Sequence, residues 1–204
     1  MSRRSLLCAV VVAILASACS GSSNSKTIRG NPKAGGRLVV AAATPTSLDP
    51  SKGSSGTDLY YLKQICDTLV SFNPLTGALE PGTAESWTIA PDGKRVTFKL
   101  RPGVKFSSGR DVTAADYVYS LSRFVNQQVG SQSYFILDKI VGYRDVLDGR
   151  TDTLAGVHAT DPLTLDIDLI EPFAELPAVL AHPAAGAAIP KEEVDKDPAA
   201  FARN

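Results

Sequence analysis

The chain has 204 residues, of which 44% are hydrophobic, and its 21 basic and 21 acidic side chains give a formal net charge of +0 at pH 7. A neutral chain without clusters of lysine and arginine lacks the basic surface of a nucleic-acid-binding protein, so no nucleic-acid partner is expected. Cysteine usage excludes a disulfide framework, because Cys66 is the only cysteine after residue 19. A buried apolar core must therefore hold the fold together.

The first eighteen residues have the pattern of an export signal. Arg3 and Arg4 precede an apolar or small stretch at 6–18, which would be roughly 20 Å long as a helix against a hydrocarbon core of about 30 Å. This length disfavours a permanent membrane span and predicts a signal peptide at 1–18. Ser2–Leu7 also fits the twin-arginine pattern, so the route of export stays open. Removing the segment leaves 19 basic and 21 acidic side chains.

Cys19 directly follows the small residues Ala16, Ser17 and Ala18. This arrangement resembles the lipobox of bacterial lipoproteins, although Ala16 stands where Leu is commonest. The resemblance implies that the Cys19 sulfur is diacylated and holds the protein at the membrane. The alternative is an ordinary secretory signal with a chance cysteine. Residues 19–35 are rich in Ser, Gly and Asn and predict a flexible tether.

Order is expected to begin with a buried strand in the apolar run 36–41, within a segment 36–48 that ends at Leu48-Asp49-Pro50. The Gly/Ser-rich stretch 51–57 predicts a loop. Apolar residues then recur at helical spacing over 58–70, with Asp58 near the N-cap. Cys66 lies on the apolar face and is expected to be a small buried residue rather than a reactive thiol.

Alternation of apolar and polar residues predicts a β-hairpin, with strands around 87–89 and 96–100 joined by Pro91–Lys94. A helix should follow, with Thr113 as its N-cap and Asp116 completing a capping box. The remaining expected elements are a helix at 133–147, strands at 156–159 and 163–169 joined at Asp161-Pro162, and helical segments at 173–180 and 191–204.

Motifs for catalysis and metal binding are missing. His158 and His182 have no spacing that closes a metal site, so no metal or cofactor is expected. No serine-nucleophile motif is present, so the sequence does not indicate an enzyme. Asp166 and Asp168 share one face of a predicted strand, and the solvent face of a sheet is favoured over a catalytic pair. Five aromatic residues are expected in the core rather than in a ligand groove: Trp87, Phe98, Tyr117, Tyr119 and Phe124.

Eight short motifs follow one another along residues 36–204. They are Leu48–Pro50, Thr68–Gly77, Leu79–Gly82, Ala84–Trp87, Phe98–Phe106, Val112–Asp116, Asp161–Leu165 and Ile189–Lys191. In this order they resemble the extracytoplasmic solute-binding protein family 5 of ABC transporters, the dipeptide/oligopeptide/nickel-binding group. Three positions depart from its pattern: Thr83 replaces the usual Leu, Ser108 an acid or Asn, and Tyr117 the commoner Val.

The resemblance implies an α/β fold, the periplasmic-binding-protein-like type II clamp with two lobes. This chain would hold most of the first lobe. Residues 36–48 would give that lobe a strand, 49–170 would form a subdomain inserted in it, and 171–204 would return into it. The second lobe would lie after these residues, so this stretch alone is not expected to bind a ligand tightly.

The resemblance also implies capture of a peptide, or a related small solute, outside the membrane and its delivery to an ABC permease and ATPase complex. The solute is left open among peptides, nickel complexes, haem, sugars and opines. The loop at Ser54, Ser55 and Gly56 would pair its backbone with the ligand, with a plain solvent loop as the alternative. A lipid-anchored envelope sensor or interaction protein that reuses the fold is the alternative function.

Overall fold

The computed structural model describes residues 35–37 and 39–202. The predicted signal peptide at 1–18, Cys19 and nearly all of the tether at 19–35 lie outside these residues, so those predictions stay predictions. Within the described part, no helix is long and apolar enough to cross a membrane. The residues from Ala41 onward pack together as one compact unit.

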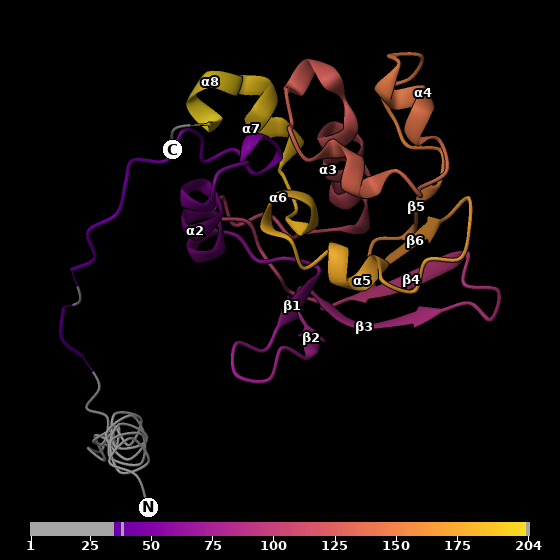
Figure 1. Ribbon diagram of the computed structural model, residues 1–204, viewed down its shortest axis with the longest axis horizontal. Helices are drawn as coiled ribbons and strands as arrows, with labels where there is room; N and C mark the ends of the chain where they lie inside the picture. Colours follow the sequence, from indigo (N-terminus) through magenta and orange to yellow (C-terminus); the bar gives the residue numbers. More distant parts are fainter. Residues whose placement is uncertain (1–34, 38, 203–204) are drawn as a thin grey trace, which may run out of the picture. The chain divides into compact units, whose positions relative to one another are not determined.

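A four-stranded antiparallel sheet forms one side of this unit (Figure 1). Its strands are β3 (Ala84–Ile89), β4 (Arg95–Leu100), β5 (Val157–Asp161) and β6 (Thr164–Asp168), in the order β3-β4-β6-β5. The predicted hairpin is confirmed, and Trp87 lies opposite Phe98 in its register. The predicted strand pair around Asp161-Pro162 is confirmed as β5 and β6. Because alternate residues point to one face, Val96, Phe98, Leu165 and Ile167 are all buried together.

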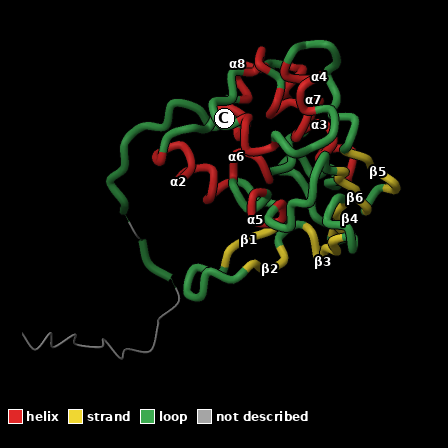
Figure 2. Tube along the Cα trace, turned by 45° about the vertical axis from the view of Figure 1, so that its right-hand side comes forward, coloured by secondary structure: helices red, strands yellow, loops and turns green. Residues whose placement is uncertain are grey.

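Helix α3 (Ala114–Val125) packs against this sheet, and Figure 2 shows the helices gathered on one side of the strands. Its buried residues include Tyr117, Leu121 and Phe124. The predicted capping box is confirmed: the Thr113 backbone N–H donates to Asp116 Oδ2 at 2.8 Å. Such a cap satisfies backbone groups that the first helical turn leaves unpaired. The sequence therefore sets where this helix begins.

Thr83 and Tyr117 meet in the core. Their hydroxyl groups are hydrogen-bonded to each other, and Thr83 Oγ1 also donates to the carbonyl of Thr68 at 3.3 Å. Thr83 is 6% exposed and Tyr117 is fully buried. Burial raises the pKa of Tyr117 above its ordinary value, so its hydroxyl stays protonated.

Helix α2 (Gly56–Ile65) differs from the predicted helix at 58–70 at both ends. It ends earlier because Val70–Phe72 forms strand β1, which pairs with β2 (Leu79–Pro81). Ile65, one of the apolar residues at helical spacing, is 58% exposed. Cys66, expected to be buried, is the C-cap and only partly buried, and burial raises the pKa of its thiol to about 11, so the thiol is protonated at neutral pH.

The expected strand at 36–41 is wrong for the residues that the structure describes there. They form no strand, and Val39 and Val40 are 75% and 54% exposed. A strand needs a neighbour to pair its backbone groups, and no described strand pairs with this run. An apolar run alone therefore did not determine a strand.

The predicted continuous helix at 133–147 is also wrong. The structure has the 3-10 helix η4 (Tyr134–Leu137) and the short helix α4 (Tyr143–Leu147). Between them, the Val141 N–H donates to the Asp168 carbonyl at 3.0 Å, so the backbone here bonds to the end of β6 instead of continuing a helix. Gly142 has a φ of +85°, and a Cβ there would lie 2.6 Å from the Ala155 nitrogen. Only glycine fits this turn.

The C-terminal part is a series of short helices: α5 (Leu176–Val179), α6 (Pro183–Gly186), α7 (Lys191–Lys196) and α8 (Pro198–Phe201). The expected helices at 173–180 and 191–204 are thus shorter than predicted. Asp197 divides α7 from α8, since its carboxylate caps the Ala199 and Ala200 N–H groups. The Leu48 N–H donates to the Ala202 carbonyl at 2.9 Å, which ties the start of the unit to its end.

Candidate functional site

The loop that follows Leu48-Asp49-Pro50 is held at its start by a buried carboxylate. Asp49 is fully buried and accepts the Ser51 N–H at 3.0 Å. Both of its oxygens also accept from the Arg123 guanidinium on α3, at 2.8 and 2.6 Å. A bidentate pair of this kind fixes direction as well as distance, and loss of one partner would leave a buried charge. The Asp49–Arg123 pair therefore fastens the loop to α3.

A second buried carboxylate, Asp58, holds the end of the same loop. Its oxygens accept from the Thr46 N–H and hydroxyl, both at 2.7 Å, and from the Ser54 and Ser55 N–H groups at 3.3 and 3.1 Å. Burial alone would raise the pKa of Asp58, but the hydrogen bonds from Thr46 and Ser55 outweigh it and hold the pKa well below its usual range. Asp58 therefore stays ionised.

The N-cap of α2 is Ser55, three residues before the expected cap. Ser55 Oγ accepts the Asp58 N–H at 3.0 Å, and Asp58 in turn accepts the Ser55 N–H, which makes a capping box. Just before it, a Cβ on Gly53 would lie 2.4 Å from the buried Leu62 side chain, so the loop packs closely on α2. The box and this close packing explain the Gly/Ser composition of the loop.

The three predicted ligand contacts, Ser54, Ser55 and Gly56, lie together at the N-terminus of α2. Ser54 and Gly56 are exposed, and Ser55 is half-buried. The N–H groups of Ser54 and Ser55 are already used by Asp58. Whether the loop contacts a ligand stays a prediction.

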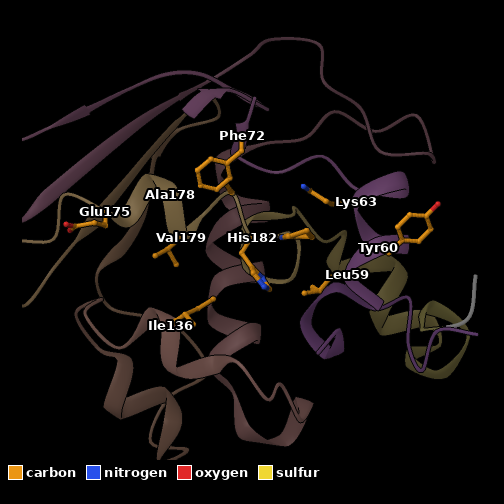
Figure 3. Close-up of a pocket in the computed structure, with 11 residues that line it drawn as sticks. Leu59, Tyr60, Lys63, Phe72, Ile136, Glu175, Ala178, Val179 and His182 are labelled. Atoms are coloured by element: carbon orange, nitrogen blue, oxygen red, sulfur yellow. The ribbon is translucent and has the colours of Figure 1, made fainter. Parts of the chain in front are cut away.

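One turn further along α2, a cavity of about 600 Å³ opens between α2, β1, η4 and the α5–α6 segment (Figure 3). Its apolar wall includes Leu59, Tyr60, Phe72, Ile136, Val179 and Pro183. Phe72 and Tyr60 are 46% and 45% exposed, which is unusual for aromatic residues of a folded unit. The cavity brings together four separate segments of the chain, so no local motif in the sequence predicts it.

His182 is the polar side chain in the middle of this cavity. It caps α6, and its Nδ1 accepts the Ala184 N–H at 3.3 Å, so Nε2 carries the ring proton. Burial lowers the pKa of His182, so the imidazole is neutral at pH 7. Figure 3 shows the ring directed into the space between Leu59 and Ile136. The sequence signal was His182-Pro183, an N-cap followed by proline at the first helical position.

The other candidates from the sequence lie elsewhere. Asp166 accepts from Thr97 at 2.5 Å, and Asp168 pairs with Arg95 at 2.5 Å and with His158 at 3.3 Å. Each carboxylate bonds to its own partners on neighbouring strands, as the prediction of a solvent-facing sheet surface requires. The two carboxylates do not form a catalytic pair. Over the described part of the chain, no group of three potential metal-binding side chains is found.

The expectation for the aromatic residues is largely confirmed. Phe98, Tyr117 and Phe124 are buried in the core, and Trp87 packs against it while partly exposed. Tyr119 was expected in the core but is only partly buried, with the Lys191 ammonium 5.7 Å from the centre of its ring. None of these five residues lines the cavity.

Curated relatives share the sequence over most of the chain. The Periplasmic oligopeptide-binding protein OppA of Escherichia coli is 36% identical over 153 residues, which are 74% of this chain and 28% of that protein. The Probable deoxycholate-binding periplasmic protein YgiS of Escherichia coli is 33% identical, over 68% of this chain and 26% of that protein. The chain thus spans about a quarter of the length of these relatives.

Solved structures share the fold. The crystal structure of Haemophilus influenzae OppA in complex with the peptide RPPGFSPFR matches with a TM-score of 0.73 and 30% identity, over 78% of this chain and 31% of that chain. The fold is therefore α/β and corresponds to part of a two-lobed periplasmic binding protein. Residues 78–204 match the family described as bacterial extracellular solute-binding proteins, family 5 Middle. The chain belongs to this solute-binding family.

Proposed function

We propose that the protein containing this chain is the substrate-binding component of an ABC importer, which captures peptides outside the membrane and delivers them to a permease and ATPase complex. The observation that carries the proposal is family membership together with relatives named for oligopeptide binding. The apolar cavity beside a fixed loop supports it, since ligand sites are concave, mostly apolar and marked by a few placed polar groups. The role is capture rather than catalysis.

Within the clamp, we assign residues 36–48 and 171–204 to one lobe and 49–170 to a subdomain inserted in it. The bond from the Leu48 N–H to the Ala202 carbonyl supports this assignment, because it joins the two ends of the unit. Closure of two lobes about a hinge would then bury the ligand and distinguish the loaded form for the permease.

Ser54, Ser55 and Gly56 are proposed to contact the ligand through their backbone. The N–H groups of Ser54 and Ser55 are used by Asp58, and the Ser55 carbonyl accepts the Leu59 N–H at 3.0 Å, so the loop would offer the exposed backbone of Ser54 and Gly56. Backbone pairing of an extended peptide is tolerant of side-chain identity. Such pairing would suit a protein that takes peptides of varied sequence.

Attachment to the membrane is proposed through a lipid on Cys19, which follows a lipobox-like sequence. Two acyl chains on one residue anchor a protein stably, whereas one chain binds only marginally. The protein would then work on the extracytoplasmic side of the membrane.

Titration calorimetry of the intact protein with a panel of short peptides tests the proposal. Saturable binding of peptides, together with a rise in the unfolding temperature as peptide is added, is expected. Absence of binding by every peptide, with binding of a sugar or a nickel chelate instead, would show that the family assignment holds but the substrate is different.

A second candidate is an apolar solute other than a peptide. The observation in its favour is the almost wholly apolar wall of the cavity, together with a relative named as probably deoxycholate-binding. Adding deoxycholate to the same calorimetric panel decides between the two.

A further inference from the structure

Helix α3 takes part in two bidentate arginine–aspartate pairs, one near each of its ends. At its start, Arg110 donates to both oxygens of Asp116, at 3.0 and 2.7 Å. Near its end, Arg123 donates to both oxygens of Asp49. The Arg110 side chain is 38% exposed, whereas the side chains of Arg123 and Asp49 are 8% and 0% exposed. In the second pair, both partners are therefore removed from water.

A buried ion pair of this kind adds little to the stability of a fold. Taking two charges out of water offsets most of their mutual attraction, and apolar side chains of similar volume often stabilise a core equally well. A bidentate pair does provide direction, because the guanidinium and the carboxylate must align to form two parallel hydrogen bonds. The Asp49–Arg123 pair is therefore better explained by the segment that it holds in place than by the stability that it adds.

That segment is the first half of the loop, which is built around Asp49. The Asp49 side chain accepts the Ser51 N–H, and its carbonyl accepts the Lys52 and Gly53 N–H groups at 3.0 and 3.1 Å. These bonds form the 3-10 turn η2 (Pro50–Lys52), directly before the proposed ligand contacts. The direction in which the loop leaves this turn therefore follows from the position of Asp49.

The two ends of the loop are held in different ways. Asp58 bonds to groups that are close in sequence, the most distant being Thr46, twelve residues away. Asp49 and Arg123 are 74 residues apart in the sequence. Loss of Arg123 should therefore release the start of the loop and leave the capping box of α2 intact.

We propose that Arg123 is a positioning residue for ligand binding, which acts through Asp49 on the loop before α2 and does not contact the ligand. Arg123 lies on α3 and does not line the apolar cavity. The proposal rests on the proposed function and adds to it a residue on another element that controls the loop. A ligand that needs the loop in position binds more weakly in proportion to the fraction of molecules in which the loop is displaced.

Binding of peptides to the intact protein, measured by calorimetry, gives the first test. Arg123→Gln should weaken binding about tenfold, as expected if the loop is in position in about a tenth of the molecules. The variant should also unfold at a lower temperature, because the Asp49 charge is left buried without its partner.

Arg110→Gln is the matched control, because it removes the other bidentate pair of α3. Arg110 bonds to Asp116 and Glu192 and not to the loop at 49–58. This variant should also unfold at a lower temperature but should bind peptides as the unsubstituted protein does. An equal loss of affinity in both arginine variants would overturn the proposal, since general destabilisation would then explain it.

A double variant separates positioning from stability. Asp49→Asn combined with Arg123→Met leaves no buried charge at this site, and the new amide oxygen can still accept the Ser51 N–H. The unfolding temperature should therefore return close to that of the unsubstituted protein. The bonds from α3 are still missing, so binding should stay about tenfold weaker. Recovery of affinity together with stability would show that Arg123 acts only on the fold.

Amide hydrogen exchange tests the hold on the loop in the absence of any ligand. In Arg123→Gln, the N–H groups of Ser51 and Gly53 should exchange about tenfold faster or more, because the turn that protects them opens more often. The Leu59 N–H bonds to the Ser55 carbonyl within α2 and should keep its rate. Unchanged exchange at Ser51 and Gly53 would overturn the proposal.

Failure of this inference can be told apart from failure of the proposed function. If peptides bind equally well to Arg123→Gln and to the unsubstituted protein, Arg123 is not a positioning residue and the peptide-binding function stands. If the unsubstituted protein binds no peptide, the proposed function is wrong. Hydrogen exchange then decides by itself whether Arg123 holds the loop.

Discussion

Thr83 and Tyr117 form a buried hydroxyl pair. Each residue alone would place an unpaired polar atom in an apolar core, and together they satisfy each other. An unpaired buried hydroxyl costs about 1–3 kcal/mol, whereas removing both partners is close to neutral. The two residues are therefore expected to stabilise the core as a pair.

Thr83→Val should lower the free energy of unfolding by about 1–3 kcal/mol, because Tyr117 is left with an unpaired hydroxyl. Adding Tyr117→Phe to this variant should restore part of the loss. Urea unfolding of the two single variants and the double variant measures the coupling. Strictly additive effects would show that the hydroxyl groups do not depend on each other.

At the scale of the element, Gly142 interrupts the helix that the sequence predicts at 133–147. It separates η4 from α4 with a φ of +85° and leaves no room for a Cβ beside Ala155. Gly142→Ala should therefore lose more stability than the about 1–2 kcal/mol of left-handed strain alone. Gly149→Ala is the control, because Gly149 has a φ of +71° but nothing within 4 Å of a Cβ. Equal losses in the two variants, measured by urea unfolding, would rule out the contact with Ala155.

Elements were predictable where their cause is local. The β3–β4 hairpin follows from alternation and a Pro-Asp-Gly turn, and α3 follows from Thr113 and Asp116. The helix expected at 133–147 failed because Val141 bonds to the Asp168 carbonyl, a contact that spacing along the chain does not reveal. The strand expected at 36–41 failed for the same kind of reason, since pairing depends on a distant neighbour.

The same distinction applies to the candidate site. The sequence alone reveals Leu48-Asp49-Pro50 and the Gly/Ser loop. It does not reveal that Asp49 pairs with Arg123, because Arg123 lies on a helix far along the chain. The cavity could not be predicted from the sequence, because its lining residues meet only in the folded chain. They include Leu59, Phe72, Ile136 and His182. Motifs contiguous in sequence identify the family, whereas the chemistry of the cavity depends on the assembled fold.

For the whole molecule, buried and paired aspartates make stability depend on pH. The pKa of Asp58, of Asp166 and of Asp168 is lowered in the folded chain by the hydrogen bonds that each accepts, and Arg95 adds its charge for Asp168. A lowered pKa stabilises the fold above the unfolded-state value of about 3.9, and this contribution is lost as the pH falls below it.

Urea unfolding across a pH series should show a steep loss of stability below about pH 4. The Asp58→Asn variant should have a lower free energy of unfolding at pH 7. Its free energy of unfolding should also fall less steeply in acid, because the variant has no carboxylate at position 58 that takes up a proton on unfolding. An identical acid slope in both proteins would exclude Asp58 as a source of the pH dependence.

The two carboxylates at the ends of the loop have a consequence for the thermodynamics of capture. With Asp49 fastened to α3 and Asp58 to Thr46 and the α2 cap, Ser54–Gly56 is held in place by the protein itself. A ligand that meets this loop loses its own conformational entropy but does not have to order the protein. In the proposed function, weak backbone contacts made with any peptide sequence would then suffice for binding, because the loop is already organised before the encounter.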